Sequence, residues 1–533
     1  MTLLNHLNTL ESAGLVRIAQ AQPNVEYLFR HTLVQEAAYA SLVRRDRQQL
    51  HRSIGETIER LYPDRLTQPD LAPLLARHFD LAGDHLRALK YFTQAGDQAA
   101  QQYANLEAIA YYARAIKLSQ QLEAAAPLDR PQLIHLFTSL GRAQQLIGHH
   151  PHALRTYQDF AQLAQQRQDK VMELAAVMER VTLHATPTPL QDPALSHQLL
   201  KQALELAHLV GDRPAEAKIN WSLMMTELFG GETSEARRYG EQSLAIAREQ
   251  QLEDQLPFTL NDLAFTYIFL GQMDLGRAAL DEVRELWRAK HNLPMLSDCL
   301  ANSALAEFYL GHFTPAVQFA REGINISESI HNAWGQSHNY GMLGYMLQEQ
   351  GQLSEALDAW INSVTYGEQS GLIATRVGTR ADLGQLYHLL GQDSLALEQV
   401  NQAHAYSETI MPIWKAWSAS VLARLYLSQN RLAEAQILID TYCPGNLQQH
   451  FARLLRSGAV NVGIVRGELA IAHQRYQTVI ELMDEMAAIL KSIGAGTFLD
   501  DAWLLKGRSL QQLNRLTEAQ SVLQQACLAA ESI

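Results

Sequence analysis

Glycine recurs at one fixed interval through the middle of this 533-residue chain, and this period constrains the fold more than any other feature. The glycines are Gly231, Gly271, Gly311, Gly351 and Gly391. A small residue follows each glycine five positions later, in the column Ala236, Gly276, Ala316, Ala356 and Ala396. Another small or compact residue precedes each by seven, in the column Met224, Ala264, Ala304, Gly344 and Gly384. Such a period is typical of repeat proteins in which each unit stacks on its neighbours.

Each unit is expected to be a pair of amphipathic helices, because its apolar residues recur at helical spacing. A glycine with positive φ ends the first helix, and the small residues lie where the two helix axes cross. Weaker units extend the array, with expected turns at Gly83, Gly148, Asn430, Gly467 and Asn514. We therefore predict an all-α superhelix of about eleven helix pairs over residues 67–533, with a strict period over about 213–410.

One unit shows the pattern most fully. It reads Tyr340-x-x-Leu343-Gly344-x-x-Leu347, then Gly351, then Ala356-x-x-x-Trp360. This pattern resembles the tetratricopeptide repeat, whose usual period is about 34 residues. The period of this chain is 40 residues, which is longer than usual. This longer repeat resembles the repeats of bacterial signal-transduction ATPases of the maltose-regulator type.

Residues 1–66 do not follow the repeat. A leucine-rich helix ends at Gly14, two short strands follow over 15–18 and 25–29, and a polar turn over 20–24 joins them. Two further helices are expected over 32–43 and from 46 to about 61. Helix followed by hairpin is typical of the end of a winged-helix domain. Without its preceding helices such a domain lacks part of its core, which leaves open whether Met1 is its natural start.

The same stretch carries a more specific motif, Tyr27-x-Phe29-x-His31-x-Leu33-x-Gln35-Glu36-x-x-Tyr39-x-x-Leu42. Over about the first 120 residues the chain resembles the segment after the ATPase core in large bacterial signal-transduction ATPases with numerous domains. The resemblance implies that His31 is a nucleotide sensor, at the place of a histidine that contacts the β-phosphate of ADP. Thr32 stands where that family has an acid. The alternative is a structural histidine that anchors the hairpin to the next helix.

Motifs for catalysis and metal binding are absent from the sequence. There is no Gly-x-x-x-x-Gly-Lys-Ser/Thr loop to cradle nucleotide phosphates, and no His-Glu-x-x-His, Gly-x-Ser-x-Gly or Cys-x-x-Cys motif. The three cysteines lie far apart, and the histidines at 149, 150 and 152 have no further ligand at a metal-binding spacing. We therefore expect no enzyme activity, no cofactor and no metal site.

Charge and hydropathy limit the classes of partner. The net charge is −13, and residues 1–60 hold seven arginines against six acids, so we do not expect nucleic-acid binding. No apolar run reaches the length of a membrane span, and the N-terminus lacks the features of a secretory signal, so we expect a cytoplasmic protein without membrane contact. The alternative function is a winged-helix DNA-binding transcriptional regulator with a repeat effector domain.

The first helix of each pair faces the concave groove in a tetratricopeptide array, and here its columns are apolar and aromatic. The candidate groove residues are Met225, Leu228, Phe229, Phe265, Ile268, Phe269, Leu305, Phe308, Tyr309 and Tyr345. Burial of these residues between neighbouring helices is the alternative interpretation. We predict a non-enzymatic protein-interaction and sensor arm of a bacterial signalling ATPase, with a protein or peptide partner or an effector on this face. An upstream ATPase or cyclase module is one such partner.

Overall fold

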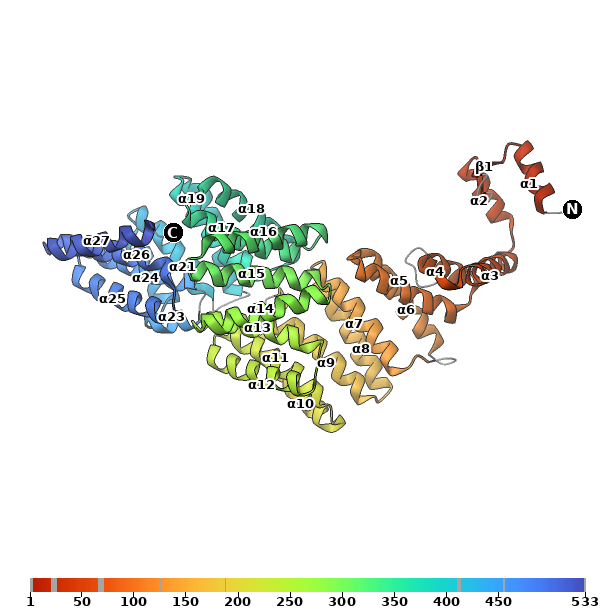
Figure 1. Ribbon diagram of the computed structural model, residues 1–533, viewed down its shortest axis with the longest axis horizontal. Helices are drawn as coiled ribbons and strands as arrows, with labels where there is room; N and C mark the ends of the chain where they lie inside the picture. The colour runs from red at the N-terminus through yellow and green to blue at the C-terminus, as the bar shows by residue number, and fades with distance from the viewer. Residues whose placement is uncertain are drawn as a thin grey trace. The chain divides into compact units, whose positions relative to one another are not determined.

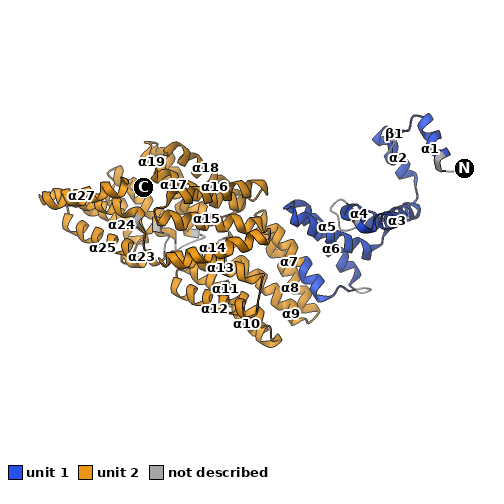
Figure 2. Cartoon of the chain, viewed as in Figure 1, with its two compact units in different colours: residues 1–136 blue, residues 137–533 orange. Residues whose placement is uncertain are grey.

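The computed structural model describes residues 3–20, 26–65, 71–123, 127–186, 188–409, 414–453 and 456–531. Contacts divide the chain into two compact units, Met1–Leu136 (unit 1) and Phe137–Ile533 (unit 2), coloured separately in Figure 2. The predicted boundary between residues 66 and 67 lies inside unit 1. Each unit is described by itself.

Unit 1 begins with the helix, hairpin and two helices expected from the sequence. Its elements are α1 (Leu3–Ser12), β1 (Val16–Gln20), β2 (Glu26–Phe29), α2 (Thr32–Ser41), α3 (Arg44–Leu61), the 3₁₀ turn η1 (Pro63–Arg65), α4 (Leu71–Ala82), α5 (His85–Gln101) and α6 (Asn105–Leu122). The two strands pair antiparallel, with Val16 opposite Phe29. Residues 21–24 of the expected turn and residue 25 of the second expected strand lie outside the described residues. The winged-helix assignment stays a prediction.

Helix α7 (Arg130–Leu146) crosses from unit 1 into unit 2, and the remaining elements of unit 2 are helical. They are α8 (His150–Gln166), α9 (Lys170–Ala185), α10 (Pro193–Val210), α11 (Arg213–Gly230), α12 (Thr233–Glu249), α13 (Gln255–Phe269), α14 (Met273–Ala289), α15 (Leu293–Tyr309), α16 (Phe313–Ser329), α17 (Ala333–Glu349), α18 (Leu353–Ser370), the π-helical turn η2 (Thr375–Thr379), α19 (Arg380–Leu389), α20 (Asp393–Thr409), α21 (Lys415–Ser428), α22 (Leu432–Tyr442), α23 (Leu447–Arg453), α24 (Arg456–Ala472), α25 (Tyr476–Ser492), the 3₁₀ turn η4 (Gly496–Phe498), α26 (Leu499–Gln512) and α27 (Leu516–Glu531).

Paired helices pack side by side through unit 2, which confirms the predicted all-α array of tetratricopeptide-like repeats (Figure 1). The five periodic glycines have φ between 73° and 89°, so each ends the first helix of its pair in the left-handed conformation. The small-residue columns allow close approach: a Cβ added to Gly344 would lie 2.7 Å from the Trp360 ring. The left-handed φ of Asn430 and Asn514 also agrees with the prediction.

One turn was predicted at the wrong residue, and a second kind of turn was not predicted. Gly467 is not a turn residue, because it lies inside α24 and Gln474 takes the left-handed turn instead. The expectation assigned the glycine to the wrong column, since Gly467 precedes that turn by seven residues, as Gly344 precedes its own. Some second helices, such as α14 and α16, also end at a left-handed residue that is not glycine, namely His291 and His331.

Segments far apart in the sequence touch within unit 2, and we call these three contacts the seam. Nε2 of His150 donates to the carbonyl oxygen of Ser370 (3.1 Å), 220 residues away. The Thr233 hydroxyl donates to the carbonyl oxygen of Ala452 (3.3 Å), 219 residues away. The hydroxyl of Thr497 donates to the carbonyl oxygen of Phe308 (3.1 Å), 189 residues away. The array therefore returns on itself, and its inner helices face one another.

Candidate functional site

A cavity of about 280 Å³ lies on the inner side of unit 2. Its wall is built by side chains from α7, α8, α9, α11, α13, α15, α17, η2 and α21, and from the turns after α9 and α18. Aromatic rings form much of this wall, namely those of Trp221, Phe258, Phe265, Phe269, Trp334, Tyr345, Trp414 and Trp417. The apolar area is of the kind that small ligands and peptide side chains fill.

Seven of the ten predicted groove residues line this cavity: Met225, Leu228, Phe229, Phe265, Phe269, Leu305 and Tyr345. The other three, Ile268, Phe308 and Tyr309, are buried in the core and are not part of its wall. Phe308 packs edge-on against Phe498 of η4, with the ring centroids 6.0 Å apart. Residues at neighbouring positions of the same inner helices thus differ, since some line the cavity and others lie in the core.

His31 lies in unit 1, as the exposed N-cap residue of α2. Its backbone is extended, with φ −136° and ψ 132°, and its side chain makes no capping hydrogen bond to the helix. The nucleotide-sensor role implied by the resemblance stays a prediction.

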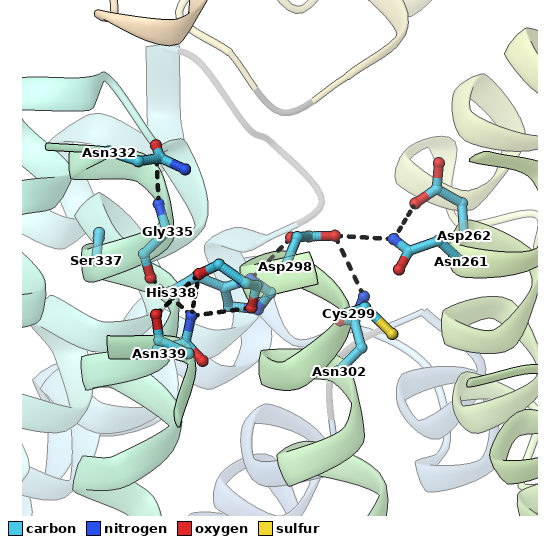
Figure 3. Close-up of polar contacts among 12 residues, drawn as sticks. Asn261, Asp262, Asp298, Cys299, Asn302, Asn332, Gly335, Ser337, His338 and Asn339 are labelled. Atoms are coloured by element: carbon cyan, nitrogen blue, oxygen red, sulfur yellow. Dashed lines mark hydrogen bonds and ion pairs between the residues drawn. The ribbon is translucent and has the colours of Figure 1, made fainter. Parts of the chain in front are cut away.

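A polar cluster interrupts the aromatic wall, and we define it as Asn261, Asp262, Asp298, Asn302 and His338 (Figure 3). Nδ2 of Asn261 lies between the two aspartates, 3.1 Å from Oδ1 of Asp262 and 2.8 Å from Oδ2 of Asp298. Nδ1 of His338 lies 3.1 Å from Oδ1 of Asp298, and Nδ2 of Asn302 lies 3.5 Å from Oδ2 of that carboxylate. The members come from α13, α15 and α17, three successive first helices, so the repeat brings them together.

Burial and the neighbouring Asp298 carboxylate together raise the pKa of Asp262 to about 7. Trp221 on α11 donates its indole N–H to Oδ2 of Asp262 (2.7 Å), which partly offsets this effect. Asp262 is half-buried, and it is one of the residues that line the cavity. Among the described residues neither aspartate forms an ion pair with lysine or arginine.

A third aspartate fixes two rings of the wall. Asp382 on α19 is only 6% exposed and accepts hydrogen bonds from the hydroxyl of Tyr345 and from the indole N–H of Trp417 (3.1 Å). Burial raises the pKa of Asp382 to about 7. The two donors lie on α17 and α21, so this one carboxyl group links three inner helices behind the cavity.

The polar cluster escaped the sequence analysis, although the repeat carried a signal for it. Asn302 follows Asp262 by one period of the repeat, and His338 follows Asp298 by the same period. Polar residues recurring at one period on an apolar helix face indicate a shared inner position.

Metal binding and membrane insertion find no support in the described part of the chain. It contains no group of three or more metal-ligating side chains, and none of its helices is long and apolar enough to cross a bilayer. What the cavity offers is an enclosed aromatic wall with a few convergent polar groups. This arrangement is suited to binding.

Comparison with known sequences finds a family model that matches one repeat. A sequence model of the tetratricopeptide repeat matches residues 500–532, a range that includes most of α26 and all of α27. An uncharacterized protein of Rhizobium meliloti (strain 1021) is 30% identical over 169 residues. These residues are 31% of this chain and 16% of that protein, so the match spans a small part of the relative's length.

Similar solved structures are helical-repeat proteins of low sequence identity. The Rap protein complexed with Competence and Sporulation Factor is 14% identical with a TM-score of 0.42, over 65% of this chain and 99% of that one. NprR in complex with its cognate peptide NprX is 12% identical with a TM-score of 0.44, over 73% and 98%. A signal transduction ATPase with numerous domains with a tetratricopeptide repeat sensor, from Pyrococcus horikoshii, is 14% identical with a TM-score of 0.35, over 75% and 61%.

Proposed function

We propose that unit 2 is a non-enzymatic binding module that takes a peptide segment or a small effector in its inner cavity. The observation that carries the proposal is the cavity itself, an aromatic space of about 280 Å³ with a polar cluster on one wall. Ligand sites combine a mostly apolar enclosure with a few placed polar groups in this way.

A ligand in this cavity touches helices of several repeats at once. Met225, Phe265, Leu305 and Tyr345 stand on four successive first helices, and Trp417 stands on a fifth inner helix further along the chain. Because each repeat packs on its neighbours, a ligand that prefers one spacing of these helices shifts the curvature of the array. Such a shift is the signal that a sensor module passes on.

The sensor is proposed to act as an arm of a bacterial signalling ATPase, with an ATPase or cyclase module as the recipient of the signal. The resemblance of the first 120 residues supports this context, as does the order of helix, hairpin and two helices over residues 3–61. In this context His31 senses the nucleotide state.

Blocking the cavity tests the proposal. Ala374 lines the cavity, and Ala374→Phe places a ring in the space that a ligand needs. Random peptides displayed on phage would be selected on the immobilised full chain and then measured by calorimetry. We expect selected peptides to bind Ala374→Phe at least ~10-fold more weakly, since a filled cavity excludes them.

The control is Ala289→Phe, which adds the same ring at the exposed end of α14 and is expected to leave affinity unchanged. Selected peptides that bind Ala374→Phe as tightly as the parent chain would place the binding surface elsewhere and refute the proposal.

A further inference from the structure

The polar cluster presents hydrogen-bond acceptors and negative charge to the cavity without a matching cation. Asp262 and Asp298 both line the cavity, and in the described residues their only partner able to carry positive charge is His338. Asn261 is fully buried between them, and its amide oxygen has no hydrogen-bond partner among the residues that the structure describes (Figure 3). Unpaired buried acceptors cost stability, but Asn261 is not part of the cavity wall, so the polar groups that a ligand meets here are the two carboxylates.

Aromatic rings stand beside these acceptors. Trp221 holds Asp262 through its indole N–H, and the Phe258 ring meets the Trp221 ring edge-on, with the centroids 6.3 Å apart. Both rings line the cavity. Aromatic faces attract cations as carboxylates do, and most strongly in a site shielded from water. A group that is cationic, rich in N–H donors and attached to an apolar body would satisfy the acceptors and the rings together.

We propose that the cavity binds its ligand through a cationic nitrogen group, an alkylammonium or a guanidinium, which lies against the side chains of Asp262 and Asp298 where they line the cavity. The inference rests on the proposed binding function and names the chemistry of the ligand. An anionic group is disfavoured there, since it would lie against two carboxylates. The one arginine of the cavity wall, Arg142, is an exposed residue of α7 outside the cluster.

The first test varies only the charge of the ligand, on the full chain at about pH 8, which lies above the raised pKa of Asp262. Calorimetry would compare 3-phenylpropylamine with 3-phenylpropionate, and the peptide acetyl-Phe-Arg-Phe-amide with its neutral citrulline analogue. We expect the cationic member of at least one pair to bind ~10-fold or more tightly than its partner. Discrimination by the amine pair alone identifies a small amine ligand, and discrimination by the peptide pair identifies a peptide side chain. No preference in either pair, or no binding of either cation, overturns the inference.

The second test removes one charge from the protein. Asp298→Asn keeps the size of the side chain, and we expect it to weaken binding of the preferred cation ~10-fold. Asp254→Asn is the matched control, because this carboxylate is fully exposed at the start of α13 and does not line the cavity. Equal affinity of the parent chain and Asp298→Asn would count against the site. Circular dichroism checks folding, and the ligand-charge comparison stands on the parent chain if the variant does not fold.

The two proposals fail in different ways. If selected peptides lose affinity for Ala374→Phe and yet show no need for a positive charge, the cavity binds ligands and the cationic preference is wrong. If selected peptides bind Ala374→Phe normally, the cavity is not the binding site and both proposals fall.

Discussion

Asp382 makes unit 2 less stable as the pH rises, and removing its charge should reverse that loss. The carboxyl group is almost fully buried, and burial raises its pKa from the ordinary 3.8 to about 7. Between those values the folded state keeps a proton that the unfolded state has released. Stability therefore falls as the pH rises through this window.

The magnitude follows from the difference in pKa. A difference of about 3 corresponds to about 4 kcal/mol in the free energy of unfolding. About 3 kcal/mol of it falls between about pH 5 and about pH 7, at about 1.4 kcal/mol for each pH unit. Asp382→Asn resembles the protonated side chain and cannot ionise. The variant should therefore gain about 3 kcal/mol relative to the parent chain when the pH is raised from about 5 to about 8.

Urea unfolding followed by circular dichroism at both pH values measures this gain. The matched control is Asp440→Asn, which neutralises an exposed carboxylate on α22 and should show no pH-dependent difference from the parent chain. A difference between Asp382→Asn and the parent chain that stays constant with pH, or that favours the parent chain at high pH, would refute the reasoning.

Two further predictions concern glycines, and urea unfolding of each variant checks them. Gly351→Ala should cost about 1 kcal/mol, because φ is 73° and nothing lies within 4 Å of the added Cβ. Gly148→Ala shares that strain and also places its Cβ 2.9 Å from the carbonyl oxygen of Gln369, so it should cost ~1–3 kcal/mol more; equal costs for the pair would show that this contact adds nothing. Gly344→Ala should cost ~1–3 kcal/mol by crowding Trp360 at 2.7 Å, and a neutral effect would mean that the ring moves aside freely.

The helix pairs and most of their turns could be predicted from the sequence, because the residues that determine them lie within each repeat. A glycine such as Gly351 needs positive φ wherever it ends a helix, so one column of the sequence predicts every such turn. The turn at His331 was hidden, because a left-handed histidine leaves no compositional trace. The register of the C-terminal repeats was harder to predict, because Gly467 allows close helix packing inside α24 and does not mark a turn.

The candidate site was readable in part, and the limit has a physical cause. Phe265 and Phe308 look alike in the sequence, yet one lines the cavity and the other meets Phe498, which belongs to a repeat much further along the chain. That contact depends on how the array returns on itself, which no local pattern encodes. The contacts of Asp298 with Asn261 and His338 likewise depend on the packing of α13, α15 and α17 against one another.

The seam has a consequence for how unit 2 can be shortened. An open solenoid loses terminal repeats one at a time, and each loss removes one interface. Here, deletion of the chain after residue 409 would remove Trp414 and Trp417 from the cavity wall. It would also remove the contact of Ala452 with Thr233, 219 residues earlier in the chain. Middle repeats would lose support that their sequence neighbours do not supply. The last repeats of unit 2 therefore help to hold its middle repeats in place, which the last repeats of an open solenoid do not do.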